Sequence, residues 1–262
     1  MTRLLVCPPD YFDVAYEINP WMHLKRRVSQ RRSIEQWKAL EKIYKKLKVR
    51  LEVIRPVKGL PDMVFTANAG LIKGKSFIPS RFRHKERQGE EKQFINWFSR
   101  HRYEVKPLPE SCVFEGAGDA LFLGEKLFAG YHFRSDIHSH SEVGKILDIP
   151  VLSLELVDRR FYHLDTCFCP LDGGAAFYYP GAFDSYACKV IIANVPDLIE
   201  VNEREAIRFA CNAVVIGKNV VMNIGCPKIS RALGERGFTV HATDTSEFLK
   251  AGGSAKCLTI RL

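Results

Sequence analysis

Short apolar runs separated by glycine-containing turns recur along the chain, and they predict β-hairpins. Four segments have this form: residues 67–80 (ANAGLIKGKSFIPS), 118–130 (GDALFLGEKLFAG), 164–180 (LDTCFCPLDGGAAFYYP) and 211–223 (CNAVVIGKNVVMN). In each of them, two runs rich in aliphatic or aromatic residues flank a tight turn that contains glycine. That pattern is typical of two antiparallel strands joined by a short loop.

Each predicted hairpin is followed by a segment whose apolar residues have helical spacing. These segments cover residues 85–101, 139–147, 188–195 and 228–237. A further short apolar strand precedes the next hairpin, as at 103–108, 150–156 and 238–243. The chain therefore repeats the order strand, strand, helix, strand, and a fixed period of this length indicates a repeat architecture.

One polar or sulfur-containing residue marks the start of every repeat. Asn68, Asp119, Asp165, Asn212 and Cys257 occupy matching positions, at intervals of 51, 46, 47 and 45 residues. The last unit is cut short, and the N-terminal run RLLVCPP can complete it. Ordinary α/β alternation also places strands at such intervals, but it does not require a polar residue at each start. We predict an α/β fold: a closed ring of five ββαβ units, one domain over residues 1–262, with these five positions around its axis.

This placement changes how the C-terminal cysteine is interpreted. Cys257 follows a glycine pair in the segment AGGSAKCLTIRL, and a free cysteine often serves as a small buried hydrophobe. A nucleophilic cysteine needs a histidine nearby, and the histidine needs an acceptor that orients it. His163 precedes Asp165 by two residues, so on a strand the two would face the same cavity.

Carboxylates and amides accompany the other repeats. Glu115 and Asp119 flank a Gly-x-Gly turn, where the backbone can approach a ligand closely. Asp62 and Asn68 belong to the first repeat. Each of these residues has an ordinary structural explanation when taken alone, since an aspartate can cap a loop and a histidine can be buried and hydrogen-bonded. Their occurrence on the same level of successive repeats favours a shared polar site.

Composition limits the class of protein. No run approaches the roughly 20 apolar residues of a membrane helix, and the N-terminus does not resemble a signal peptide. Eight cysteines in 262 residues are too dilute for a disulfide scaffold. We therefore expect a reduced, cytoplasmic protein. The net charge of +9 fits a solvated basic face or an anionic small molecule as well as a nucleic acid.

A metal site is not expected. The only close cysteine pair, Cys167 and Cys169, has no second pair to complete a zinc site. His132, His138 and His140 lie on a predicted loop and helix start without nearby cysteine or glutamate ligands.

From end to end, the chain resembles the guanidine-modifying superfamily, which includes arginine deiminases, dimethylarginine dimethylaminohydrolases and arginine amidinotransferases. The motifs are PDMVFTANAG, EGAGD, HLDT and the terminal glycine-rich loop with its cysteine. The segments CPPDYFDVAYEINPWM, RHKERQGEE and FEGAGD look most like an arginine dihydrolase module, which in cyanobacteria precedes an ornithine-processing domain. The resemblance implies a five-bladed pseudo-symmetric α/β-propeller, no cofactor and a small-molecule substrate. The chain stops after the cysteine strand, so no second domain is expected. A homo-oligomer is left open, and no nucleic acid or membrane partner is expected.

The resemblance also implies residue roles. Cys257 is the nucleophile, His163 transfers protons, and Glu115 orients His163, with Asp119 as the alternative. The residues implied to bind substrate are Asp165 at the guanidinium nitrogens, Arg87 and Arg134 at the α-carboxylate, and Asn19, Asp62, Phe65, Asn68 and Asp119 around them.

The implied reaction is cysteine-dependent hydrolysis of the guanidino group of arginine through a covalent thiouronium. Asn68 replaces an acidic residue that is usual in deiminases, and an amide can both donate and accept hydrogen bonds to a ureido group. This favours an arginine dihydrolase, which continues to ornithine, ammonia and carbon dioxide. The alternatives are a dimethylargininase or arginine deiminase that releases citrulline, an amidinotransferase, and a non-catalytic propeller that binds RNA or the ribosome.

Overall fold

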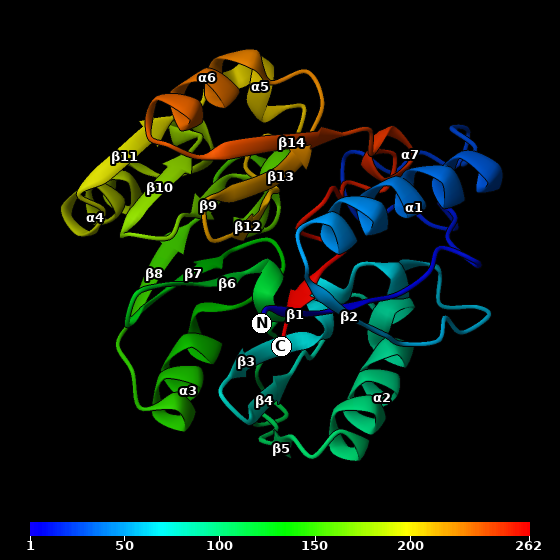
Figure 1. The fold of residues 1–262 in the computed structure, drawn as a ribbon. Helices are drawn as coiled ribbons and strands as arrows, with labels where there is room; N and C mark the ends of the chain where they lie inside the picture. The colour runs from blue at the N-terminus through cyan, green and yellow to red at the C-terminus, as the bar shows by residue number, and fades with distance from the viewer.

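The computed structural model describes residues 1–262 and contains five sheets of three strands each, arranged in a ring (Figure 1). The sheets are β3 (Gly70–Lys73), β4 (Ser76–Pro79) and β5 (Glu104–Val105); β6 (Ala120–Leu123), β7 (Lys126–Tyr131) and β8 (Val151–Glu155); β9 (Phe168–Pro170), β10 (Ala175–Tyr178) and β11 (Asp197–Glu200); β12 (Val214–Ile216), β13 (Asn219–Asn223) and β14 (Thr239–Thr243); and β15 (Ile260–Arg261), β1 (Arg3–Val6) and β2 (Arg50–Val53).

Every sheet has the same topology. Its middle strand pairs antiparallel with one neighbour and parallel with the other. In the first four sheets the antiparallel pair is the predicted hairpin, turned at Gly74, Gly124, Gly173–Gly174 and Gly217 with positive φ, which glycine adopts without steric cost. The predicted five-bladed α/β-propeller of ββαβ units is confirmed.

The two ends of the chain close the ring. β1 lies between β15 and β2, with Leu4 opposite Arg261 and Leu5 opposite Ile260. The N-terminal run thus completes the fifth unit, as the repeat predicts. The backbone N–H of Ala67 also donates to the Cys257 carbonyl (3.1 Å), which ties the first repeat to the segment that bears the cysteine.

Helices lie around the outside of the ring (Figure 1). They are α1 (Gln30–Lys46), α2 (Lys85–Arg100), α3 (Ile137–Leu147), α4 (Ser185–Asn194), α5 (Glu203–Ala206), α6 (Pro227–Glu235) and α7 (Ser246–Leu249). Side chains cap several of them. For example, Asp136 accepts from the Ser139 N–H at the start of α3, and Asp184 accepts from the Ala187 N–H at the start of α4. Such caps satisfy backbone donors that have no partner within the helix.

The starts of the predicted hairpins differ from the strand that the sequence suggested. Asn68 lies in the one-turn 3₁₀ helix η2 (Thr66–Ala69), Asp165 lies in η5 (Leu164–Thr166), and Asp119 is the C-cap residue directly after η3 (Gly116–Gly118). The strand argument that placed His163 and Asp165 on one face is therefore wrong, although both side chains do line the site. The strands stop short of these turns, and local bonds such as Thr166 N–H to the His163 carbonyl (3.1 Å) replace the ladder.

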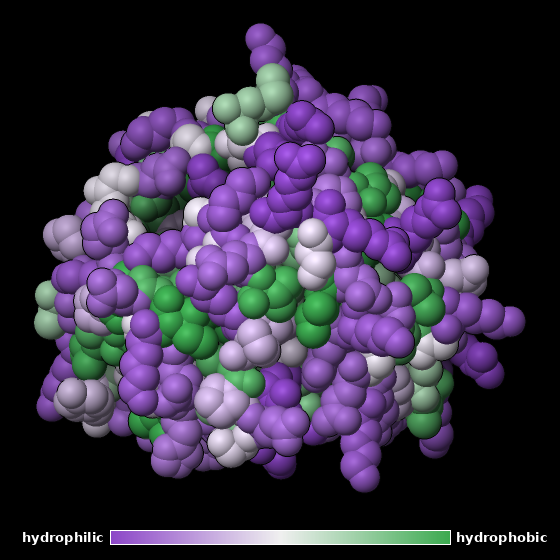
Figure 2. Space-filling model, turned by 90° about the horizontal axis from the view of Figure 1, so that it is seen from below, coloured by the Kyte–Doolittle hydropathy of each residue, from purple (hydrophilic) through white to green (hydrophobic).

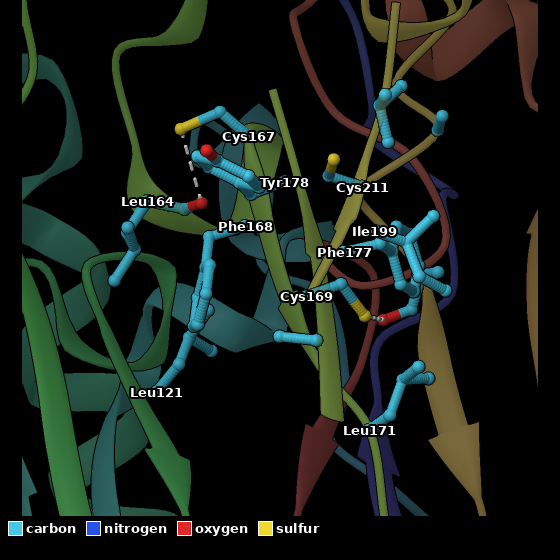
Figure 3. Packing of buried hydrophobic residues seen from close by; sticks show 14 of the residues in the cluster. Leu121, Leu164, Cys167, Phe168, Cys169, Leu171, Phe177, Tyr178, Ile199 and Cys211 are labelled. Carbon is cyan, nitrogen blue, oxygen red and sulfur yellow. Dashed lines mark hydrogen bonds between the residues drawn. The ribbon is translucent and has the colours of Figure 1, made fainter. Parts of the chain in front are cut away.

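Aromatic and aliphatic side chains fill the space between sheets and helices. The largest cluster covers both faces of the β9–β10 pair: Phe168 lies on one side with Leu121, and Cys169 lies on the other side with Phe177 (Figure 3). All eight cysteines are free. Figure 2 shows one side of the molecule as mostly hydrophilic, with small, separate hydrophobic areas. No helix combines the length and the hydropathy that crossing a membrane would require.

Candidate active site

A buried carboxylate, that of Glu115, contacts one arginine and one histidine side chain. Glu115 Oε2 lies 2.7 Å from His163 Nε2 and 2.9 Å from Arg134 Nη1. All three side chains are almost completely buried. Burial opposes ionisation of Glu115, yet Arg134 and His163 hold the pKa of this carboxyl well below its usual range. Glu115 therefore accepts hydrogen bonds as a carboxylate.

This contact orients the imidazole. Because the Glu115 carboxylate is an acceptor, the hydrogen-bonded Nε2 of His163 carries the proton. Nδ1 is buried and has no hydrogen-bond partner. An unsatisfied buried nitrogen is costly, so this atom is the one available to a ligand. Glu115, rather than Asp119, holds His163.

The nucleophile candidate is held by an amide and a carboxylate. Cys257 Sγ accepts from Asn212 Nδ2 (3.0 Å) and lies 3.5 Å from Asp165 Oδ2. Asn212 Oδ1 accepts from the backbone N–H groups of Cys257 and Ser254, so this one side chain fixes the glycine-rich loop. Asn212 was on the predicted ring of polar positions but received no role, and its place in the repeat is the signal that could have found it.

Burial determines the protonation of this pair. Burial raises the pKa of the Cys257 thiol well above its usual value, and the nearby Asp165 raises it further. Burial also raises the pKa of Asp165 to about 6, while Lys256 acts in the opposite direction. The unliganded site therefore contains a thiol, and a cation placed beside Asp165 would favour the thiolate.

Asn68 is fixed by a second buried ion pair. Arg87 donates to Glu90 through Nε (2.9 Å) and Nη2 (2.8 Å), and its Nη1 donates to Asn68 Oδ1 (3.0 Å). Asn68 Nδ2 in turn donates to the Glu115 carbonyl (3.3 Å). Arg87 thus settles which side of the amide is the donor side. Glu90 was missed by the sequence reasoning, although it follows Arg87 by one helical turn.

Asp119 and Asp62 were also predicted to belong to the site, and both make their hydrogen bonds to groups other than His163 and Cys257. Asp119 accepts from the Ser135 hydroxyl (2.6 Å) and the Leu164 N–H (3.1 Å), and it has no hydrogen bond to the His163 ring. Asp62 accepts from the Tyr16 hydroxyl (3.0 Å) and lies 3.8 Å from Arg87 Nε. Its Oδ1 is buried without a partner.

The glycine-rich loop contacts the remaining two. Asn19 Nδ2 donates to the Ala251 carbonyl (3.1 Å). A Cβ at Gly253 would lie 2.4 Å from the Phe65 ring, so that ring packs directly on the loop. Both residues are therefore placed against the segment that presents Cys257.

The three histidines considered as metal ligands do not form a cluster. His132 contacts Glu155 (3.1 Å), whereas His140 contacts the Ser153 hydroxyl and the Gly130 carbonyl. No group of three histidine, cysteine or acidic side chains in the structure could hold a metal ion. A cavity of about 680 Å³ opens elsewhere, between the hairpins of β6, β9 and β12, and it contains Lys256 but none of His163, Glu115 or Cys257.

A thiol beside a carboxylate, together with an oriented imidazole, can support nucleophilic attack and proton transfer. A ring of five ββαβ units that brings together a thiol, a carboxylate and an imidazole in this way is typical of the guanidine-modifying propellers. The family described as "N,N dimethylarginine dimethylhydrolase, eukaryotic" matches residues 13–262, and this chain belongs to the dimethylarginine dimethylaminohydrolase family.

Individual relatives agree with this assignment. The chain is 52% identical over 265 residues to the bifunctional arginine dihydrolase/ornithine cyclodeaminase ArgZ of Synechocystis sp., covering 99% of this chain and 37% of that protein. It is 42% identical over 260 residues to a dimethylarginine dimethylaminohydrolase of Mycobacterium tuberculosis, covering 99% of this chain and 85% of that protein. The crystal structure of the N-terminal domain of ArgZ bound to substrate superposes with a TM-score of 0.97 at 51% identity, covering 100% of this chain and 98% of that one.

The raised pKa of Cys257 predicts how this thiol reacts with a neutral alkylating agent. Because the thiolate is the reactive form, the alkylation rate should keep rising with pH above about 8.5, the ordinary cysteine pKa. The measurement is the rate of carbamidomethylation of the Cys257 peptide by mass spectrometry, with circular dichroism confirming that the fold persists. A rate that levels off below pH 8 would contradict the raised pKa.

Proposed function

We propose that this protein is an arginine dihydrolase, which hydrolyses the guanidino group of arginine to ornithine, two ammonia molecules and carbon dioxide. The observation that carries the proposal is the Asn68 amide, held by Arg87 beside the Glu115–His163 pair. ArgZ provides support, because solved structures of its N-terminal domain are described as bound to substrate, bound to product and covalently bound to a reaction intermediate. This chain covers only 37% of the full-length ArgZ protein.

The first half-reaction uses Cys257, Asp165 and His163. The guanidinium pairs with Asp165, and its positive charge favours the Cys257 thiolate. His163 Nδ1 takes the thiol proton as the thiolate attacks the central carbon. His163 then gives this proton to the departing nitrogen, ammonia leaves, and an S-alkylthiouronium remains. His163 then removes a proton from water, which attacks the same carbon. Collapse breaks the carbon–sulfur bond, regenerates Cys257 and forms the ureido group of citrulline. Each well-placed proton transfer contributes about 10²–10⁴-fold.

In the second half-reaction the carbon that Cys257 attacks belongs to a neutral ureido group, so the negative charge that develops on its oxygen has to be stabilised. When Cys257 attacks the ureido carbon, negative charge develops on its oxygen. Asn68 can donate to that oxygen through Nδ2, because Arg87 occupies Oδ1. Ammonia leaves to give an S-carbamoyl enzyme, water releases the carbamate, and the carbamate decomposes to carbon dioxide and ornithine. Loss of one such oxyanion donor typically costs about 2.7–4 kcal/mol.

A second candidate is an enzyme that stops at citrulline, such as a dimethylargininase. The 42% identity to the mycobacterial dimethylaminohydrolase favours it. Incubation with arginine, citrulline and methylarginines, followed by product identification, distinguishes the two. Release of dimethylamine and citrulline at a rate above that of arginine turnover would support the second candidate.

Substitution of Asn68 provides the sharpest test of the dihydrolase. Asn68→Ser or Asn68→Asp should shift the product from ornithine toward citrulline while arginine consumption continues. The amide donor is lost in both variants, and the aspartate carboxylate would also repel the developing oxyanion. Product ratios are measured by mass spectrometry beside the parent, with Cys257→Ser as the inactive control.

Two results would refute this role of Asn68. One is a parent enzyme that accumulates citrulline stoichiometrically. The other is that both variants still form ornithine at the parental yield. In the first case the dihydrolase activity itself is wrong, and in the second only the residue assignment is.

The contacts of the two arginines predict how the substrate carboxylate is bound. Arg87 makes four hydrogen bonds within the protein, whereas Arg134 makes two, to Glu115 and the Ile18 carbonyl, and stacks on Tyr162. We therefore assign Arg134 the larger share of carboxylate binding. Agmatine lacks that carboxylate and should have a kcat/KM lower than that of arginine by about ten- to a hundredfold, which corresponds to the loss of a charge-assisted hydrogen bond. Equal kcat/KM values for the two compounds would show that neither Arg87 nor Arg134 binds the substrate carboxylate.

A further inference from the structure

Gly118 separates two nitrogen atoms that face the site. It is the last residue of η3, one position before Asp119. A Cβ at this position would lie 2.2 Å from Asn68 Nδ2 and 3.4 Å from His163 Nδ1. The first distance is far too short for any side-chain carbon, and the second is close contact. The amide donor and the free imidazole nitrogen thus approach the same small space, directly over the Gly118 Cα.

The backbone at Gly118 does not itself demand glycine. Gly116 in the same turn has φ +61°, which favours glycine, but Gly118 is not in the left-handed region. An alanine could therefore adopt the Gly118 backbone conformation. The contact with Asn68 is what excludes a side chain here.

Asn68 is held against Gly118 from the other side. Its Oδ1 accepts from Arg87, whose guanidinium is in turn fixed by two bonds to Glu90. Its backbone carbonyl accepts from the Ser80 hydroxyl (2.6 Å). The amide nitrogen itself donates to the Glu115 carbonyl (3.3 Å). A Cβ added at Gly118 therefore has to turn the whole amide out of this hydrogen-bonded position, whereas the backbone of Asn68 can stay in place.

We propose that Gly118 is a specificity-determining residue: its missing side chain allows the Asn68 amide to reach the reacting carbon, and this commits citrulline to the second attack. The proposal rests on the dihydrolase function. The first attack depends on Cys257, Asp165 and His163. Of these, only His163 is near a Cβ at Gly118, and its Nδ1 would be at ordinary van der Waals distance (3.4 Å) rather than displaced. Filling the space should therefore affect the two half-reactions unequally.

The test is a double-mutant cycle between Gly118→Ala and Asn68→Ser. In Gly118→Ala the amide must swing away, so the citrulline-to-ornithine ratio should rise at least about tenfold, as expected for a lost oxyanion donor, while arginine consumption changes much less. A serine side chain ends near the position of the Asn68 Cγ, which is 3.5 Å from the new Cβ, an ordinary contact that needs no displacement. Adding Gly118→Ala to Asn68→Ser should therefore change the ratio by less than about twofold, because the two changes remove the same interaction. Gly234→Ala is the matched control, since a Cβ at Gly234 in α6 meets nothing within 4 Å.

Each outcome decides the proposal. An unchanged product ratio in Gly118→Ala, with ornithine still formed by the parent, overturns it and leaves the dihydrolase function intact. An equal shift in the Asn68→Ser background also overturns it, because the effect would then not pass through the amide. If Gly118→Ala is inactive or unfolded, the double variant must recover the arginine consumption of Asn68→Ser alone, and failure to recover it overturns the proposal. Citrulline from the parent itself would instead refute the dihydrolase.

Discussion

The carboxylate of Glu115 is fully buried between Arg134 and His163, and a buried charge is tolerated only when its partners are in place. Arg134 follows β7 in the same unit as Glu115, whereas His163 begins the next unit, so the arrangement is complete only when these two neighbouring units pack together. Once formed, it fixes the proton on Nε2 of His163 and leaves Nδ1 without a partner. Glu115 begins the η3 turn, which also contains Gly118 and ends before Asp119. Asp119 accepts from the Leu164 N–H and thereby fixes the backbone next to His163.

The buried charges at this end of the axis do not balance. Arg87 and Arg134 are the buried cations, whereas the buried carboxyl groups are Asp62, Glu90, Glu115, Asp119 and Asp165. Glu90 and Glu115 are matched by the two arginines. The Asp165 carboxyl contacts the neutral Cys257 thiol, and burial raises its pKa to about 6 although Lys256 acts in the opposite direction. A guanidinium beside Asp165 would give this carboxylate a cationic partner and favour the thiolate.

The repeat in the sequence was sufficient to predict the ring, its four hairpins and the closing pair of terminal strands, because periodic apolar runs and turns report local structure directly. It also predicted that Cys257, Asp165 and Asn68 share a level of the fold. The local conformation at His163 could not be predicted, since η5 forms where the sheets end and no apolar pattern marks a single 3₁₀ turn. Glu90 and Asn212 were missed although the sequence contains a signal for each, since Glu90 lies one helical turn after Arg87 and Asn212 occupies the matching position of the fourth repeat.

In the proposed reaction Cys257 forms a covalent bond with the guanidino carbon, and this adduct can be trapped. The enzyme is mixed with arginine, quenched in acid at short times and digested, and the Cys257 peptide is analysed by mass spectrometry. We expect a transient mass increase equal to arginine less ammonia on that peptide alone, which is absent from Cys257→Ser. Continued turnover with no adduct at any time, or an adduct on another of the eight cysteines, would contradict it.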